Sequence, residues 1–413
     1  MNVLSALRAR VTPIPRSWRI AVWCAVIAVA TAASGVIATI SVSDWNPTVL
    51  VRMAQEEELA PLARAADPDF MFVHYHGRGD GVAYYAIARD PLARGEEHDR
   101  FTWPAYRYGH PGYSWLAWAL TLGNAAFIPY AFVLLNLVGI GVAGAAASLV
   151  ARELGYTEWA GLAIAVNPGL VYSTTIDTSE PVAAALLLIV LLLWLRGRWR
   201  VALPLIAALC FMKEWFVLVP VGLGLWELLR YARTRRRDLR VRTVALVLTI
   251  VPFGLWYLYV LLRFNEWPAS PTRKLVEFPP IGWIQTMRAA AERGTGAFDG
   301  VVTGHAAVPL LAVAGAALAF GAFRALRLRT PVHAVYLAFM PVVFAMNEWG
   351  LLYVKDMIRE LAIPLVLLPA AVAGCASVRL GVRVRGEPGG VPLESGVPEP
   401  AWAAGSGEPG QGD

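Results

Sequence analysis

Gly79, Asp80 and Gly81 lie at the centre of a polar, aromatic segment, residues 72–113, in a chain that is otherwise largely apolar. The two glycines flank one carboxylate with residues that have no side chain, so a sugar ring or a substrate backbone can approach it closely. Such a carboxylate can act as a general base that removes the proton of a substrate hydroxyl. The alternative is a turn in which Asp80 caps nearby backbone groups. On spacing alone the turn is favoured, and Asp80 is a candidate catalytic base.

Four further charged residues interrupt apolar runs: Asp177 and Glu180 in one region, Lys213 and Glu214 in the next. Charges inside apolar runs cost free energy and tend to be paired and functional. Asp177 and Glu180 either cap the helix that starts near Pro181 or bind acceptor hydroxyls. Lys213 and Glu214 either form a structural ion pair or bind substrate, with Lys213 on an anionic group of the substrate and Glu214 holding Lys213.

Three more residues are candidate phosphate contacts: Arg107, His110 and Arg359. A fixed cation beside a departing phosphate stabilises the transition state more than the ground state. The alternative for each is anchoring to lipid headgroups, which is favoured for Arg107 taken alone. His74 and His76 match no strong metal signature, so no metal or other cofactor is predicted, and a divalent cation is not indicated.

The composition is typical of a polytopic membrane protein. The chain has 413 residues, 57% of them hydrophobic and 16% charged, against about 25% charged in an ordinary soluble domain. The formal net charge is +6, but the arginines cluster between apolar runs, as the positive-inside rule expects, so no nucleic-acid partner is predicted. The cysteines Cys24, Cys210 and Cys375 lie in apolar runs and are expected to be small buried residues.

The order of apolar and basic segments predicts a multi-pass protein of the cell membrane with roughly ten transmembrane segments and both termini cytoplasmic. An uncleaved first helix is favoured over a signal peptide because the apolar run continues past Ala30-Thr31-Ala32. Shortened helices bring the four charged residues of the apolar runs to the outer side, where Asp80 lies. The expected parts are a cytoplasmic N-terminus (1–19), a first transmembrane helix (20–40), an outer loop with the candidate catalytic Asp80 (41–112), the remaining bundle (113–377) and a disordered cytoplasmic tail (378–413).

Several motifs, taken in order, resemble the bacterial membrane glycosyltransferases of the GT-C superfamily. The resemblance covers 16–376 and rests on G-D-G-x-x-Y-Y-x-I-A from Gly79, A-Y-R-Y from Ala105, Asn167-Pro168-Gly169, Asp177-x-x-Glu180-Pro181, Lys213-Glu214, and Arg359-Glu360-Leu361 with Pro364. The chain departs from the family pattern at Gly109-His110-Pro111-Gly112 and in having Lys213 where many relatives have arginine.

The resemblance implies an all-α, GT-C-type helical bundle with a large first outer loop. It also implies a mannosyltransferase-like activity that transfers a sugar, with inversion, from a polyprenyl-phosphate donor to a lipid, glycan or protein acceptor on the outer face of the membrane. The acidic residue of the first outer loop is then the catalytic base, which in this chain is Asp80. The other hypotheses are a transporter or flippase for a lipid or sugar, and an inactive scaffold of a cell-envelope complex.

Overall fold

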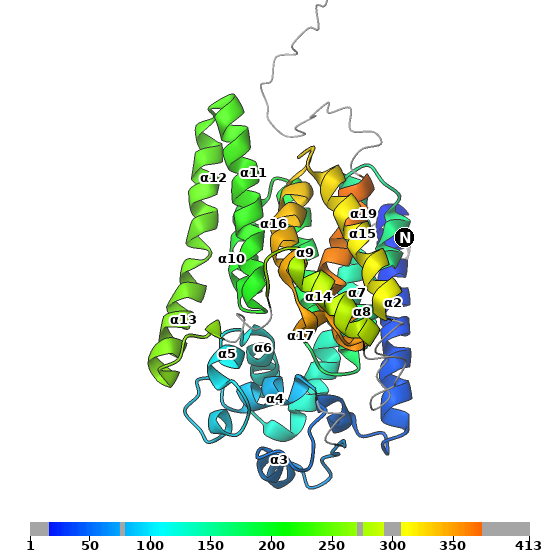
Figure 1. Cartoon of the computed structure of the whole chain (residues 1–413), viewed down its shortest axis with the longest axis vertical. Coiled ribbons are helices and arrows are strands. Elements are labelled where there is room, and N and C mark those ends of the chain that lie inside the picture. The colour runs from blue at the N-terminus through cyan, green and yellow to red at the C-terminus, as the bar shows by residue number, and fades with distance from the viewer. Residues whose placement is uncertain (1–15, 75–78, 271–275, 293–306, 374–413) are drawn as a thin grey trace, which may run out of the picture. The chain divides into compact units, whose positions relative to one another are not determined.

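The computed structural model describes residues 16–74, 79–270, 276–292 and 307–373 (Figure 1). Within these ranges the regular structure is helical, apart from isolated β-bridges between Ala54 and Val73 and between Val276 and Met346. The predicted all-α class is therefore confirmed.

Within the described residues, five helical segments are long and apolar enough to cross a membrane. They are α2 (Arg16–Ser41), η4 (Ala125–Phe127) with α7 (Ile128–Glu153), η6 (Glu214–Val217) with α11 (Leu218–Thr234), α12 (Arg237–Leu248) with α13 (Val251–Phe264), and α15 (Ala307–Ala325). Four shorter apolar helices accompany them: α9 (Glu180–Leu195), α10 (Trp199–Cys210), α16 (Pro331–Ala345) and α19 (Ala362–Ala373). The described helices thus include five candidate membrane spans, and the larger count of roughly ten crossings stays a prediction.

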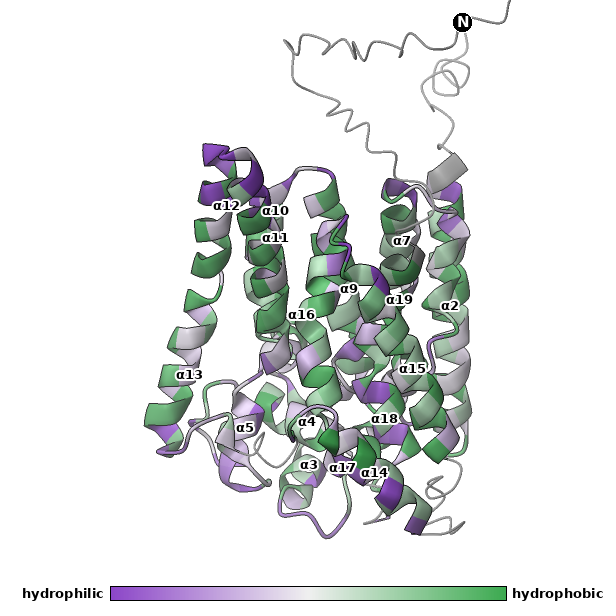
Figure 2. Cartoon of the chain, turned by 45° about the horizontal axis from the view of Figure 1, so that its top comes forward, coloured by the Kyte–Doolittle hydropathy of each residue, from purple (hydrophilic) through white to green (hydrophobic). Residues whose placement is uncertain are grey.

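The first loop folds into short helices at one end of the long ones (Figure 1). The arginine-rich turn between α11 and α12 lies at the opposite end, and Figure 2 shows that turn as hydrophilic and the long helices as mostly hydrophobic. The loop contains η1 (Pro47–Val51), α3 (Ala60–Ala66), α4 (Gly81–Arg89), η3 (Glu97–Asp99) and α5 (Pro104–Tyr108), followed by α6 (Gly112–Thr121). The remaining short elements are η5 (Glu158–Ala163), α8 (Pro168–Thr174), α14 (Ile281–Glu292), α17 (Glu348–Leu351) and α18 (Val354–Glu360).

Helix α7 packs closely against both α2 and α9 through glycine. A Cβ added at Gly144 would lie 2.9 Å from the carbonyl oxygen of Cys24 in α2, and one added at Gly139 would lie 2.9 Å from the backbone nitrogen of Val182 in α9. Small residues allow this approach of helix backbones where apolar surroundings provide little other driving force. The start of α9, which carries Glu180, is therefore fixed against α7.

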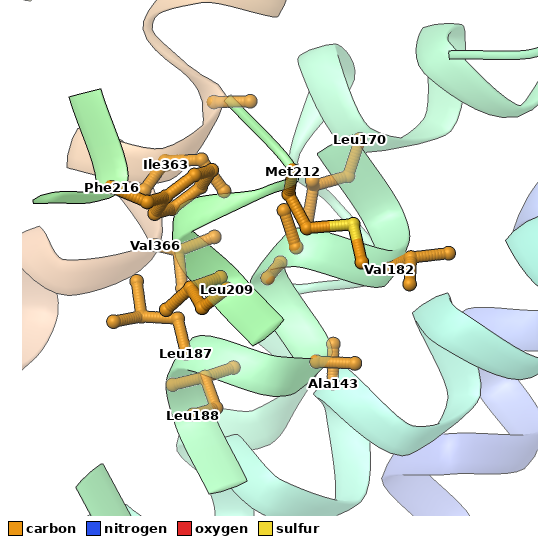
Figure 3. Packing of buried hydrophobic residues seen from close by; sticks show 14 of the residues in the cluster. Ala143, Leu170, Val182, Leu187, Leu188, Leu209, Met212, Phe216, Ile363 and Val366 are labelled. Carbon is orange, nitrogen blue, oxygen red and sulfur yellow. The ribbon is translucent and has the colours of Figure 1, made fainter. Parts of the chain in front are cut away.

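Figure 3 shows part of a buried apolar cluster, some of whose members adjoin the charged residues in the sequence. Leu187 and Leu188 of α9 meet Leu209 of α10 and Val366 of α19 there (Figure 3). Met212, in the same cluster, directly precedes Lys213. Close packing of this kind fixes the backbone of the adjoining segments, which carry the charged side chains.

We expect Gly139→Leu to separate α7 from α9 and to lower the free energy of unfolding by about 1–3 kcal/mol, the usual cost of overpacking. Gly224→Ala is the matched control, because no other atom lies within 4 Å of a Cβ built at that position of α11. Its stability should stay the same or rise slightly, since alanine favours helix more than glycine. Unfolding of both variants in detergent micelles checks the prediction, and equal stability of Gly139→Leu and wild type would contradict it.

Candidate functional site

Asp80 stands at the N-terminus of α4 in a tightly packed turn. The amide of Gly79 donates to the carbonyl oxygen of Arg52 at 3.1 Å. A Cβ at Gly81 would lie 2.7 Å from the carbonyl oxygen of Val51 and 3.0 Å from that of Ile176, so only glycine fits there. Asp80 makes no side-chain capping bond to α4. Its carboxylate is therefore held in place by its backbone and available for other partners, unlike the carboxylate of a capping turn.

Two guanidinium groups bind the carboxylate of Asp80, one on each oxygen. Arg107 Nη2 lies 2.7 Å from Oδ1, and Arg359 Nη1 donates to Oδ2 at 2.5 Å. Burial alone would raise the pKa of Asp80, but the positive charges of Arg107 and Arg359 outweigh it and hold that pKa well below its usual value. The site thus joins residues of α5 and α18 that are far apart in the sequence.

The asparagine-proline-glycine sequence at the start of α8 explains how α18 comes to this position. Asn167 accepts a hydrogen bond from the amide of Leu170 and donates one to the carbonyl oxygen of Ala362 in α19. A Cβ at Gly169 would overlap the carbonyl oxygen of Ile358, the residue before Arg359. The motif therefore fixes α8 against α18 and α19 and so sets the position of Arg359.

Lys213 pairs with a glutamate that the sequence reasoning missed. Its Nζ donates to both carboxylate oxygens of Glu360, at 2.9 and 2.8 Å, and lies 3.8 Å from Oε1 of Glu180. Burial would lower the pKa of Lys213, but the negative charges of Glu360 and Glu180 raise it overall. The idea that Glu214 holds Lys213 is corrected, because both hydrogen bonds from Nζ go to Glu360. No local pattern could have found this pair, whose members are 147 positions apart.

Glu214 has uncharged partners instead. Its Oε1 accepts a hydrogen bond from the hydroxyl of Tyr106 at 3.3 Å, and its Oε2 lies 3.4 Å from Nδ1 of His110. Burial lowers the pKa of His110 to about 4, despite the nearby charge of Glu214, so the imidazole is neutral at pH 7. Neither Oε2 of Glu214 nor Nδ1 of His110 has a hydrogen-bond partner among the described residues. This pair can therefore still bind a ligand group.

These charged side chains line one cavity of about 560 Å³. Its wall includes Asp80, Arg107, Glu180, Lys213, Glu214 and Arg359, together with Asp356 and Glu360, which neighbour Arg359 on α18. The other part of the wall is apolar and aromatic, with Trp103, Trp215, Val217, Leu218, Val342 and Met346. A ligand that fits both parts has an anionic or polar group and an apolar portion.

Seven of the eight residues chosen from the sequence belong to this arrangement, and Asp177 does not line the cavity. Asp177 is fully buried in a left-handed conformation (φ 49°), and neither carboxylate oxygen has a hydrogen-bond partner among the described residues. Burial raises its pKa well above the usual value. Asp177 is therefore buried outside the cavity wall and is not open to acceptor hydroxyls there.

The described part of the chain contains no group of three or more His, Cys, Asp or Glu residues arranged to hold a metal ion. Comparison of the chain with protein-family models and with curated proteins gives no match. The resemblance to GT-C enzymes therefore stays an expectation from the sequence motifs alone.

We expect Lys213→Met to lower the free energy of unfolding by up to about 3–5 kcal/mol, because it removes the nearer of the two cations that pair with Glu360 and leaves only Arg359, at 3.4 Å. Glu360→Gln removes that carboxylate charge. The loss caused by Lys213→Met should therefore be smaller in a Glu360→Gln background than in the wild type. Detergent-induced unfolding of the two single variants and the double variant measures the coupling, and simple additivity would refute it.

The neutral state of His110 predicts a specific loss of stability in acid. Its pKa is lowered from 6.5 to about 4 in the folded protein, so below pH 6.5 the unfolded chain binds a proton that the folded chain does not. The stabilisation is present above pH 6.5 and is lost as the pH falls towards 4, by about 3 kcal/mol in total. Thermal unfolding from pH 4 to pH 8 should show this loss in the wild type and less of it in His110→Gln. Identical pH profiles would rule out a contribution from His110.

Proposed function

We propose that this chain is an integral membrane glycosyltransferase of the GT-C type, which moves a sugar from a polyprenyl-phosphate carrier to an acceptor on the outer face of the membrane. The observation that carries the proposal is the cavity in which Asp80, three cationic side chains and an apolar aromatic wall meet. A lipid-linked sugar phosphate needs cations for its phosphate and apolar surface for its chain. An acceptor hydroxyl needs a nearby carboxylate.

In the proposed reaction the acceptor oxygen attacks the anomeric carbon of the donor sugar as the bond from that carbon to the phosphate oxygen breaks. The electron pair of that bond leaves with the phosphate, and the hydroxyl proton passes to the carboxylate of Asp80. Arg107, Arg359 and Lys213 offset the negative charge that grows on the departing phosphate. Attack from the face opposite the phosphate gives inversion.

Glu180, Glu214 and His110 are the proposed contacts for substrate hydroxyls. Oε2 of Glu180 is buried without a hydrogen-bond partner among the described residues, as are Oε2 of Glu214 and Nδ1 of His110. Buried polar groups are normally satisfied, so unpaired ones on or beside a cavity wall favour a polar ligand. Sugar hydroxyls both donate and accept hydrogen bonds and suit this mixed set.

The proposed membrane orientation follows from charge. The α11–α12 turn contains Arg235, Arg236 and Arg237 and lies at the end opposite the short helices around Asp80 (Figure 1). Clusters of arginine favour the cytoplasmic side, which assigns Asp80 and its cavity to the outer side. A lipid-linked donor would enter from the outer leaflet, and the acceptor could be a lipid, a glycan or a protein.

The experiment that tests the proposal uses purified protein in lipid nanodiscs, a panel of radiolabelled polyprenyl-phosphate sugars and a cell-envelope acceptor fraction. Asp80→Asn should reduce transfer by about 10²–10⁴-fold, the usual contribution of general base catalysis. Glu56→Gln is the control, because Glu56 is an exposed carboxylate of the same loop and does not line the cavity. It should transfer at the wild-type rate.

No transfer with any donor, in protein shown to be folded, would refute the glycosyltransferase proposal and favour a transporter, a flippase or an inactive scaffold. Flux of labelled lipid or sugar across reconstituted vesicles would then separate the first two from the third. Undiminished transfer by Asp80→Asn would remove Asp80 from the catalytic role while keeping the enzyme class.

A further inference from the structure

The proposed base and the proposed phosphate ligands bind each other in the free protein. Each oxygen of Asp80 is engaged by a different guanidinium group, from Arg107 and from Arg359. A general base needs a lone pair free to accept a proton, and charge-assisted bonds to both oxygens lower its basicity. As it stands, Asp80 is a weak base.

The same two arginines have the chemistry to bind a phosphate. Guanidinium groups match carboxylate and phosphate oxygens with similar geometry, so Asp80 occupies positions that phosphate oxygens could take. Nε of Arg359 is buried and has no hydrogen-bond partner among the described residues, which leaves a donor for a further oxygen. Both arginines line the cavity, and the side chain of Arg107 is 20% exposed.

We propose that the carboxylate of Asp80 and a phosphate group of the substrate compete for Arg107 and Arg359, so that phosphate binding releases Asp80 to act as a base. This inference rests on the proposed function for its catalytic meaning, whereas the competition itself is a property of binding. It predicts an order of events. The donor phosphate engages the arginines first, and the acceptor hydroxyl is activated afterwards.

The surrounding charges allow this exchange without loss of the arginine position. Nη2 of Arg359 lies 3.4 Å from Glu360 and 3.8 Å from Asp356, and its Nε lies 3.9 Å from Glu180. These carboxylates keep Arg359 in place when Asp80 no longer binds it. Arg107 has fewer contacts among the described residues. Apart from its ion pair with Asp80, its guanidinium carbon lies 5.7 Å from the ring centroid of Tyr106. Arg107 is thus the arginine with more freedom to turn towards an incoming phosphate.

The test measures binding without turnover. Wild type, Asp80→Asn and Asp356→Asn, each in nanodiscs, are titrated with a polyprenyl phosphate that carries no sugar and, separately, with inorganic phosphate. Asp80→Asn should bind both probes more tightly, by about tenfold, because the arginines no longer have a charged competitor. A gain with the polyprenyl phosphate alone would place the competition at the lipid-linked group, and a gain with both would show a general phosphate site.

Asp356→Asn is the matched control. It removes one carboxylate from the same wall, but Asp356 lies 3.8 Å from Arg359 and does not occupy the donor positions that Asp80 holds. Its gain in affinity should be much smaller than that of Asp80→Asn. Equal gains would overturn the proposal, because they would reflect only the loss of one negative charge near the phosphate.

Three further outcomes bear on the proposal. If Asp80→Asn binds phosphate no more tightly than wild type does, the proposed competition is overturned. If that variant does not fold, Arg107→Gln in an otherwise native site supplies the second measurement. This variant lacks one of the two arginines for which Asp80 and phosphate compete, so it should bind both probes more weakly. Unchanged binding would overturn the proposal. Tighter binding by Asp80→Asn together with no sugar transfer by wild type would refute the proposed function and leave the competition standing.

Discussion

The ion pairs around Arg359 hold together parts of the chain that are distant in sequence. Arg359 contacts Asp80 from the first loop, Glu180 from the start of α9, and its own neighbours on α18. A buried charge without a partner is costly. Each of these segments therefore depends on the others, and the cavity wall is stable only as a complete set of opposed charges.

Direct backbone contacts position the site residues more tightly than the ion pairs do. Gly81 lies against Val51 and Ile176, and Gly169 lies against Ile358, so the turns that carry Asp80 and Arg359 meet other backbones directly. The amide of Gly112 donates to the carbonyl oxygen of Phe211 at 2.8 Å, which fixes the start of α6 beside the chain that leads to Lys213. Long charged side chains are flexible, whereas backbone contacts of this kind allow little movement. The charged side chains are thus well positioned because the backbone segments that carry them contact other backbones directly.

Much of the helical architecture could be predicted from the sequence, because apolar runs between arginine clusters leave a strong signal. The apolar runs 126–150 and 182–195 correspond to α7 and α9, each within a few residues. The segment 49–66 alternates apolar and charged residues with a helix-like period, yet it does not form one continuous helix. Arg52 adopts a left-handed conformation that ends η1, and Val49, Leu50 and Val51 are buried against the bundle.

The candidate site could be predicted in its residue types more than in its pairings. Glu180, Lys213 and Glu214 could be identified because they interrupt apolar runs. A charge in such surroundings costs free energy and is seldom present without a role. The partner of Lys213 could not be predicted, since Glu360 belongs to a different part of the chain and nothing local connects them. Asp177 and Glu180 looked equivalent in sequence, yet the turn before α9 buries the first and brings the second to the cavity.

The bond between Lys213 and Glu360 also bears on how the protein is made. During synthesis the segment with Lys213 emerges well before the segment with Glu360, so for that interval the lysine lacks its main counter-charge. A nascent chain in this state would expose a cation at the end of two apolar helices, which disfavours their stable association. The cavity wall is therefore complete only once α18 has been made, and a chain truncated before α18 lacks the main counter-charge of Lys213.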